Sequence, residues 1–265
     1  MKIKTLSVIA LMSIAAPALA NEVALLHAAG SLRGALTEVS AEFQKATKIE
    51  VKAKYGPSGL LKDEIDGGAK AEVFASANMN HPQALAKANK AGPVQMFARN
   101  RLCALVRRGL EVTSANLLER MLDQNIKLGT STPKADPSGD YAWEVFKKAE
   151  AIRAGSFAAL DKKALQLTGG PNSPPAPKDK NVYGAVVAEG KADIFLTYCT
   201  NAIVAKRENP AQNVVTLPET LAVGADYGLT VVNGASANAK RLADYILSAD
   251  GQAILAKHGF AAPSK

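Results

Sequence analysis

The pattern of apolar and polar positions predicts two strand–helix units near the start of the chain. An apolar strand over residues 23–29 runs into a Gly-Ser pair ending at Ser31, and apolar residues then recur at helical spacing. A second strand, residues 49–55, runs into a Gly-Pro-Ser triplet ending at Ser58, and a second helical pattern follows. In a parallel sheet the carboxyl ends of successive strands share one edge. The pattern therefore predicts that both serines emerge at that edge.

Two interpretations of these serines follow from their position. Serine is a favoured N-cap, so each side chain could serve only its own helix. A helix N-terminus also presents unpaired N–H groups and a positive dipole end, which together hold anions. Because the junction occurs twice, we favour an anion-binding site that contains Ser31 and Ser58.

Strand-like and helix-like segments alternate along most of the chain, which indicates an α/β fold. No internal repeat and no change of composition divides the chain into sequential halves. A segment rich in proline and glycine, residues 168–180, is expected to be an exposed loop. The further predicted strands are residues 72–77, 101–106, 126–130, 192–198 and 227–232.

Residues 1–20 have the pattern of a secretory signal peptide. Lys2 and Lys4 precede a short apolar run, and Ala18-Leu19-Ala20 resembles a cleavage site. The apolar run is shorter than the about 20 residues that cross a bilayer. We therefore expect a soluble protein of the periplasm that begins near Asn21.

The charge of the chain bears on its possible binding partners, and its two cysteines bear on a possible disulfide. The whole chain has a formal charge of +8, which becomes +6 when Lys2 and Lys4 are removed with the signal peptide. The basic residues are interleaved with acids and aromatic residues make up only 5%, so no nucleic-acid partner is expected. Export permits a disulfide between Cys103 and Cys199. Two buried thiols are the alternative, and the sequence leaves both open.

The sequence lacks the motifs and residue spacings that are typical of the enzymes and metal sites considered below. The three histidines, His27, His81 and His258, have no second metal ligand at suitable spacing. Gly-x-Ser-x-Gly, Walker-type and Gly-x-Gly-x-x-Gly motifs do not occur. We therefore expect a binding protein without a cofactor rather than an enzyme.

Several segments, in order along nearly the whole mature chain, resemble the periplasmic molybdate-binding family. The members of this family are substrate-binding components of ABC importers with the class II periplasmic-binding fold. The segments that carry the resemblance are residues 28–32, 55–60, 71–77, 136–142, 181–185, 196–198 and 251–260.

The resemblance implies a two-lobed α/β fold, each lobe a mixed sheet flanked by helices, with the ligand in the cleft between lobes. Lobe I is expected to contain residues 21–102 and 229–265, and lobe II residues 103–228. Two strands, near residues 102–106 and 229–232, would cross between them. Trp143, the single tryptophan, falls on a helix expected to face the cleft.

The resemblance also implies the ligand and its contacts. A dehydrated tetrahedral dianion, molybdate or tungstate, is held by neutral donors alone. The other partner is an ABC permease in the inner membrane, and the binding protein is expected to be a monomer. Carried over by motif, the donors are Ser31 and Ser58 from lobe I and Ser138, Val182 (through its backbone N–H) and Tyr198 from lobe II.

Three departures from the family pattern bear on which anion binds. Asn78 stands where the family usually has aspartate, Ser138 stands where a small apolar residue is common, and the loop of residues 168–180 is long. One alternative is the same fold binding another anion, sulfate-like or an organic carboxylate. A more distant alternative is a secreted serine hydrolase, for which His27 would be the candidate base.

Overall fold

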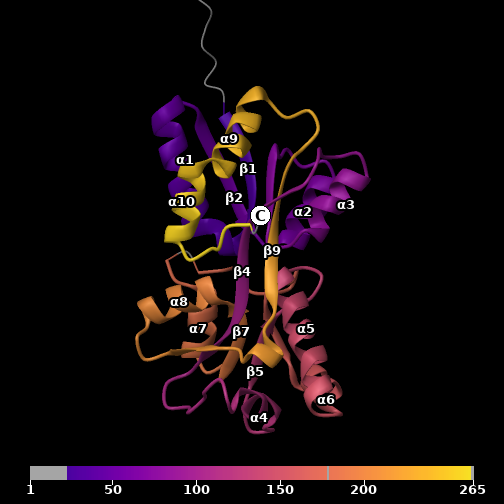
Figure 1. The fold of residues 1–265 in the computed structure, drawn as a ribbon, viewed down its shortest axis with the longest axis vertical. Coiled ribbons are helices and arrows are strands. Elements are labelled where there is room, and N and C mark those ends of the chain that lie inside the picture. The colour runs from indigo at the N-terminus through magenta and orange to yellow at the C-terminus, as the bar shows by residue number, and fades with distance from the viewer. Residues whose placement is uncertain (1–22, 178, 264–265) are drawn as a thin grey trace, which may run out of the picture.

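The computed structural model describes residues 23–177 and 179–263 and has the two-lobed α/β architecture that the sequence predicts (Figure 1). The predicted signal peptide, residues 1–20, lies outside the described residues. No helix in the described part of the chain is long and apolar enough to cross a membrane.

The first lobe, at the top of Figure 1, is a sheet with helices on both faces. Its strands lie in the order β2-β1-β3-β9, with β1 parallel to both β2 and β3, and β9 antiparallel to β3. Helices α1, α9 and α10 cover one face, and α2 and α3 cover the other (Figure 1). The bounds are β1 Val23–Ala29, the 3-10 turn η1 Gly30–Leu32, α1 Arg33–Thr47, β2 Glu50–Gly56, α2 Ser58–Asp66, β3 Val73–Ser76, α3 Asn80–Lys87, β9 Gly224–Val231, α9 Ala237–Leu247 and α10 Ala249–Lys257.

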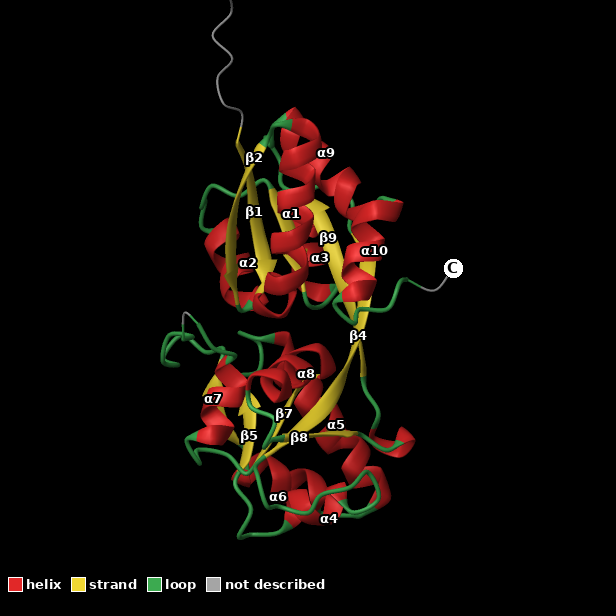
Figure 2. Cartoon of the chain, turned by 90° about the vertical axis from the view of Figure 1, so that its left-hand side faces the viewer, coloured by secondary structure: helices red, strands yellow, loops and turns green. Residues whose placement is uncertain are grey.

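The second lobe repeats the layered arrangement, with α7 and α8 on one side of its strands and α5 and α6 on the other (Figures 1 and 2). Its strands follow the order β4-β7-β5-β6, and β8 pairs with β4. The bounds are β4 Gln95–Val106, α4 Leu117–Leu122, β5 Leu128–Ser131, α5 Pro137–Ile152, α6 Ser156–Lys163, β6 Leu165–Thr168, α7 Val182–Ala188, β7 Ile194–Tyr198, α8 Cys199–Glu208, β8 Asn213–Thr216 and the 3-10 turn η2 Glu219–Leu221.

Strand β4 belongs to both lobes. Its residues up to Arg101 pair with β9 of the first lobe, and its residues from Leu102 pair with β7. The expected boundary between residues 102 and 103 lies beside this change of partners, whereas the boundary between 228 and 229 lies inside β9. Because β9 pairs with β4 from Gly224 onward, we propose that the second crossing between lobes precedes Gly224.

The two strand–helix units form as predicted, because their pattern is local. Strands β1 and β2 are parallel, and their last residues, Ala29 and Gly56, are register partners. Helix α1 buries Leu36, Val39 and Phe43, three of the positions that the helical spacing predicted to be apolar contacts. Both Gly-Ser junctions therefore leave the sheet side by side at its carboxyl edge.

The cysteines form a disulfide, one of the two alternatives that the sequence left open. The Cys103 and Cys199 sulfurs are 2.02 Å apart. Cys103 lies on β4 just after the change of partners, and Cys199 is the first residue of α8. The bond therefore ties the start of α8 to the strand that joins the lobes.

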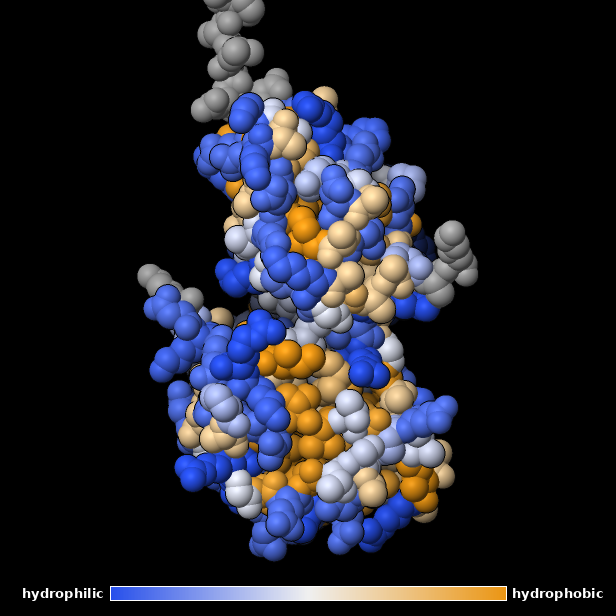
Figure 3. All heavy atoms as spheres, turned by 60° about the vertical axis from the view of Figure 1, so that its left-hand side comes forward, coloured by the Kyte–Doolittle hydropathy of each residue, from blue (hydrophilic) through white to orange (hydrophobic). Residues whose placement is uncertain are grey.

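The surface narrows to a waist between the two lobes, as the space-filling view shows (Figure 3).

Candidate functional site

Neither junction serine caps its helix. The structure has no side-chain capping bond at the start of η1, α1 or α2. The Ser31 hydroxyl instead lies 3.0 Å from the hydroxyl of Tyr227, and the Ser58 hydroxyl oxygen accepts a bond from the Ala77 N–H at 3.1 Å. Capping alone therefore does not explain these two side chains.

Ser58 and Tyr198 meet at the same residue from opposite lobes. The Ala77 N–H donates to Ser58, and the Ala77 carbonyl accepts a bond from the Tyr198 hydroxyl at 3.2 Å. Tyr198 is the last residue of β7, so its side chain reaches from the second lobe to the first. Because the Ser58 oxygen accepts the Ala77 bond, its own hydrogen remains to be donated elsewhere.

Tyr227 joins Ser31 to this group, and the sequence analysis did not single it out. It lies on β9, it is fully buried, and its ring centroid is 5.5 Å from that of Tyr198. Burial raises the pKa of both tyrosine hydroxyls, so both keep their protons at neutral pH. The sequence showed only a tyrosine in an apolar strand, and no local pattern connects it with Ser31.

Ser138 lies near the start of α5, and its hydroxyl has no hydrogen-bond partner among the residues that the structure describes. The residue is 0% exposed. The side chain of Asp136, the N-cap, accepts a bond from the Ser138 N–H at 3.0 Å. On the same helix, Tyr141 packs against Tyr198 with a ring separation of 6.2 Å. An unpaired buried hydroxyl is costly unless something binds it, so Ser138 is a candidate contact for a ligand.

Asp136 is the acidic group nearest this helix start. Its burial raises the pKa from the usual 3.8 to about 6, although the bond from Ser138 acts in the opposite direction. Around it lie further buried hydroxyls, among them Ser131 and Thr168, whose oxygens are 2.9 Å apart. The second lobe thus presents a layer of hydroxyl groups behind the start of α5.

Val182 is the first residue of α7. The side chain of the N-cap, Asn181, accepts bonds from the N–H groups of Tyr183 and Gly184 but not from that of Val182. The Val182 N–H therefore lies at a helix start outside the capping bonds. Ser58 and Tyr198 share Ala77 as a hydrogen-bonded neighbour, and Ser31 is connected to them through Tyr227, which packs against Tyr198. Ser138 and Val182 are placed by the starts of their helices.

The two lobes also touch through their backbones beside Ser58. The Gly59 N–H donates to the Ala135 carbonyl of the second lobe at 2.8 Å. A β-carbon on Gly59 would lie 2.2 Å from the Lys134 carbonyl oxygen, so no larger residue fits this approach. The start of α2 is thus in direct contact with the segment that leads into α5.

Asn78 performs the local task of a capping residue. Its side-chain oxygen accepts bonds from the Ser76 hydroxyl at 3.1 Å and from the His81 N–H at 3.0 Å. An aspartate at this position could accept the same bonds, so this departure from the family pattern preserves the local structure.

Trp143 lies on α5, the helix that has Ser138 near its start and also carries Tyr141. Its indole N–H donates to Asp161 of α6 at 2.8 Å, and its ring packs against Phe146. The helix begins at the candidate site, but this side chain contacts the neighbouring helix.

Among the described residues, the hydroxyl of Ser31 is bonded to Tyr227 and not to His27. The His27 Nδ1 is buried without a hydrogen-bond partner among these residues, and burial lowers the pKa of the ring. The Ser31 hydroxyl has a tyrosine hydroxyl as its neighbour, which does not activate a serine at neutral pH. The arrangement of described residues provides hydrogen-bond donors rather than a nucleophile with its base.

Comparisons with known proteins identify the family and the fold of the chain. The family model of bacterial extracellular solute-binding proteins matches residues 24–261. An uncharacterised Pasteurella multocida protein, PM1146, is 34% identical over 88% of this chain and 96% of its own. The molybdate-binding protein ModA of Escherichia coli is 26% identical over 94% of this chain and 93% of its own. The solved Azotobacter vinelandii periplasmic molybdate-binding protein superposes with a TM-score of 0.73 at 19% identity, covering 91% of this chain and all of the other.

The fold is that of the class II periplasmic binding proteins. Within that class, the chain belongs to the family of bacterial extracellular solute-binding proteins.

Proposed function

We propose that this chain is the periplasmic substrate-binding component of an ABC importer and that it binds a tetrahedral oxyanion, molybdate or tungstate, between its lobes. The contacts would come from the hydroxyls of Ser31, Ser58, Ser138 and Tyr198 and from the backbone N–H of Val182. The Tyr198 hydrogen, which is donated to the Ala77 carbonyl in this structure, would turn to the anion when it binds. The ligand-bound form would then dock on a membrane permease, delivering the anion for import.

The observation that carries the proposal is that the serine hydroxyls at the helix starts do not cap their helices. Ser31 and Ser58 occupy helix starts without capping them, and Ser138 has a buried hydroxyl without a partner. A fully deprotonated oxyanion has only acceptor atoms, so a site of neutral donors complements it. Helix starts add a favourable field without lysine or arginine.

The size of the anion gives the expected selectivity. Molybdate and tungstate have nearly the same size and charge, so fixed donors should bind both about equally. Sulfate has shorter bonds to oxygen and would leave some donors unpaired. Each buried donor left unpaired costs about 1–3 kcal/mol, which corresponds to roughly tenfold or more in affinity.

Calorimetric titration of the purified protein tests the proposal. We expect molybdate and tungstate to bind well ahead of sulfate and phosphate, and Ser31→Ala and Ser58→Ala each to weaken molybdate binding about tenfold. Ser40→Ala is the matched control, because its hydroxyl bonds only to the Leu36 carbonyl within α1. Binding of sulfate or an organic carboxylate without binding of either metal oxyanion would overturn the molybdate assignment.

A further inference from the structure

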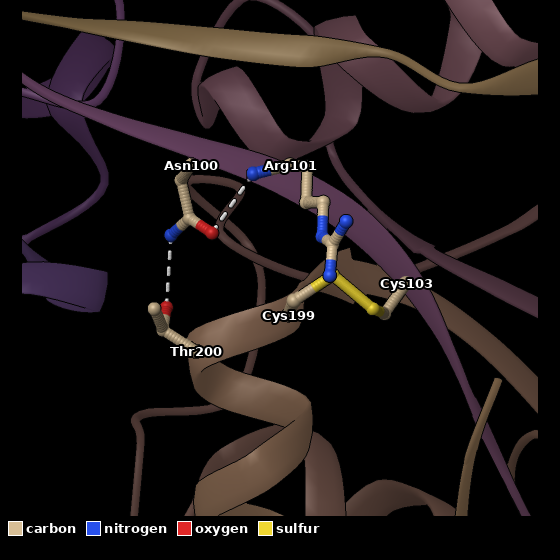
Figure 4. Close-up of a disulfide and its surroundings, with 5 residues drawn as sticks. All are labelled: Asn100, Arg101, Cys103, Cys199 and Thr200. Carbon is tan, nitrogen blue, oxygen red and sulfur yellow. Dashed lines mark hydrogen bonds between the residues drawn. A yellow bond between two sulfur atoms is a disulfide. The ribbon is translucent and has the colours of Figure 1, made fainter. Parts of the chain in front are cut away.

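A continuous series of hydrogen bonds runs from the strand that joins the lobes to Ser31. The Asn100 side-chain oxygen accepts a bond from the Arg101 N–H at 2.9 Å, and its amide nitrogen donates to Thr200 at 2.9 Å (Figure 4). The same nitrogen lies 3.3 Å from the Tyr227 hydroxyl, which lies 3.0 Å from the Ser31 hydroxyl. The series thus connects β4, α8, β9 and the first junction serine.

The Arg101 N–H fixes the orientation of the Asn100 amide, whereas either hydroxyl could donate between Tyr227 and Ser31, so the donor of that bond is part of the inference. A backbone N–H can only donate, so the Arg101 N–H identifies the oxygen of the Asn100 amide and leaves the NH₂ group facing Thr200 and Tyr227. The Tyr227 oxygen therefore accepts a hydrogen from Asn100. Its own hydrogen, which burial retains by raising the pKa of the hydroxyl, is then available for Ser31.

We infer that Asn100 and Tyr227 are positioning residues that fix the Ser31 oxygen as an acceptor and leave the Ser31 hydrogen free for the anion. The inference deepens the proposed function, because it rests on Ser31 contacting the ligand. A serine oxygen that already accepts from Tyr227 keeps one of its two acceptor sites, while its hydrogen is directed away from Tyr227 and toward the ligand. The series thus makes Ser31 discriminate against anions that carry a proton.

This discrimination can be measured by comparing the affinities for molybdate and hydrogenphosphate. At mildly alkaline pH, molybdate carries no proton, whereas hydrogenphosphate keeps one P–OH group that needs an acceptor in the site. Removing the Tyr227 hydroxyl would free a second acceptor site on the Ser31 oxygen and let the hydroxyl rotate, so that Ser31 accepts that hydrogen more readily. The ratio of the two affinities therefore reports the orientation of the Ser31 hydroxyl. If Tyr227 had only a structural role, its substitution would not change this ratio.

The experiment is calorimetric titration of Tyr227→Phe with each anion, compared with the unaltered protein. We expect molybdate to bind about tenfold more weakly while hydrogenphosphate is unchanged or improved, so that the molybdate-to-phosphate ratio falls about tenfold or more. Tyr245→Phe, a change of the same kind on α9, is the control and should leave the ratio unchanged. Thermal unfolding monitored by circular dichroism verifies that each variant is folded.

Asn100→Leu tests the same series of hydrogen bonds at Asn100, the end away from Ser31. If Tyr227→Phe does not fold, this variant decides whether the inference holds. It removes the donor to Tyr227 while keeping the tyrosine, and it should lower the ratio in the same direction. An unchanged ratio in a folded Tyr227→Phe protein would overturn the inference while leaving the proposed function intact. Failure of the unaltered protein to bind any oxyanion would instead overturn the proposed function, and the inference with it.

Discussion

Ser138 and Ser156 are buried serines at the starts of α5 and α6, and neither hydroxyl has a hydrogen-bond partner within the described residues. They differ in their surroundings. Ser138 follows Asp136 on the helix that packs against Tyr198, whereas Ser156 follows a turn at Gly155, at the far end of α5. The pair therefore allows the proposed ligand contact of Ser138 to be compared with a buried serine that is not proposed to contact the ligand.

Ser138→Ala should weaken molybdate binding about tenfold, because the bound anion loses one donor. The free energy of unfolding without ligand should stay the same or rise slightly, since the substitution removes an unpaired buried hydroxyl. Calorimetry measures the first effect, and urea unfolding measures the second.

Ser156→Ala is the matched control for that change. It should alter unfolding in the same way and leave anion affinity unchanged. Equal affinity of the Ser138→Ala variant and the unaltered protein would show that the Ser138 hydroxyl does not contact the anion.

At the scale of single residues, the sequence predicted the site residues that a local sequence pattern marks. Ser31 and Ser58 stood out because a strand, a small residue and a helix follow one another directly. Tyr227 did not, because it acquires its neighbours only when β9 pairs with β4 and brings its hydroxyl beside Asn100 and Ser31. The direction of the Trp143 side chain could not be predicted, because it depends on the packing of α6 against α5.

Among the elements, α2 makes a direct backbone contact between the lobes. Its second residue, Gly59, donates its N–H across to Ala135, and the backbones approach too closely for a side chain. Ser58 immediately precedes it. The helix start thus contributes both a candidate ligand hydroxyl and a contact between lobes.

Gly59→Ala should hold the lobes apart and weaken anion binding at least about tenfold, because an added β-carbon would collide with the Lys134 and Ala135 carbonyls. Small-angle scattering with saturating molybdate should show a larger radius of gyration than for the unaltered protein. Gly67→Ala, at the other end of α2, is the control and should behave like the unaltered protein. A Gly59→Ala protein that binds and closes normally would show that this contact is dispensable.

The elements themselves were predictable where their pattern is local. The strands expected at residues 72–77, 126–130 and 192–198 correspond to β3, β5 and β7. The short strands β6 and β8 were missed, because four residues carry too little alternation to distinguish a strand from a loop. Strand β4 begins at Gln95, six residues before the predicted start, because its first half is a strand through pairing with β9.

At the scale of the whole molecule, β4 and the disulfide connect the two halves of the candidate site. Asn100 precedes the point where β4 changes partners, and Cys103 follows it. The disulfide holds Cys199, the residue after Tyr198, against this strand. A two-lobed fold of this kind can close on an anion, excluding water and strengthening the hydrogen bonds to it. The discontinuous lobes also explain why the sequence shows no change of composition between domains.

The most direct test of the central claim is a crystal structure with tungstate, measured at the absorption edge of tungsten. Our account predicts one strong anomalous peak between the lobes, within hydrogen-bond distance of the Ser31, Ser58 and Tyr198 hydroxyls, with the starts of α5 and α7 on its other side. A folded protein whose tungsten peaks lie only at surface lysines, or that shows no peak at saturating tungstate, would contradict it.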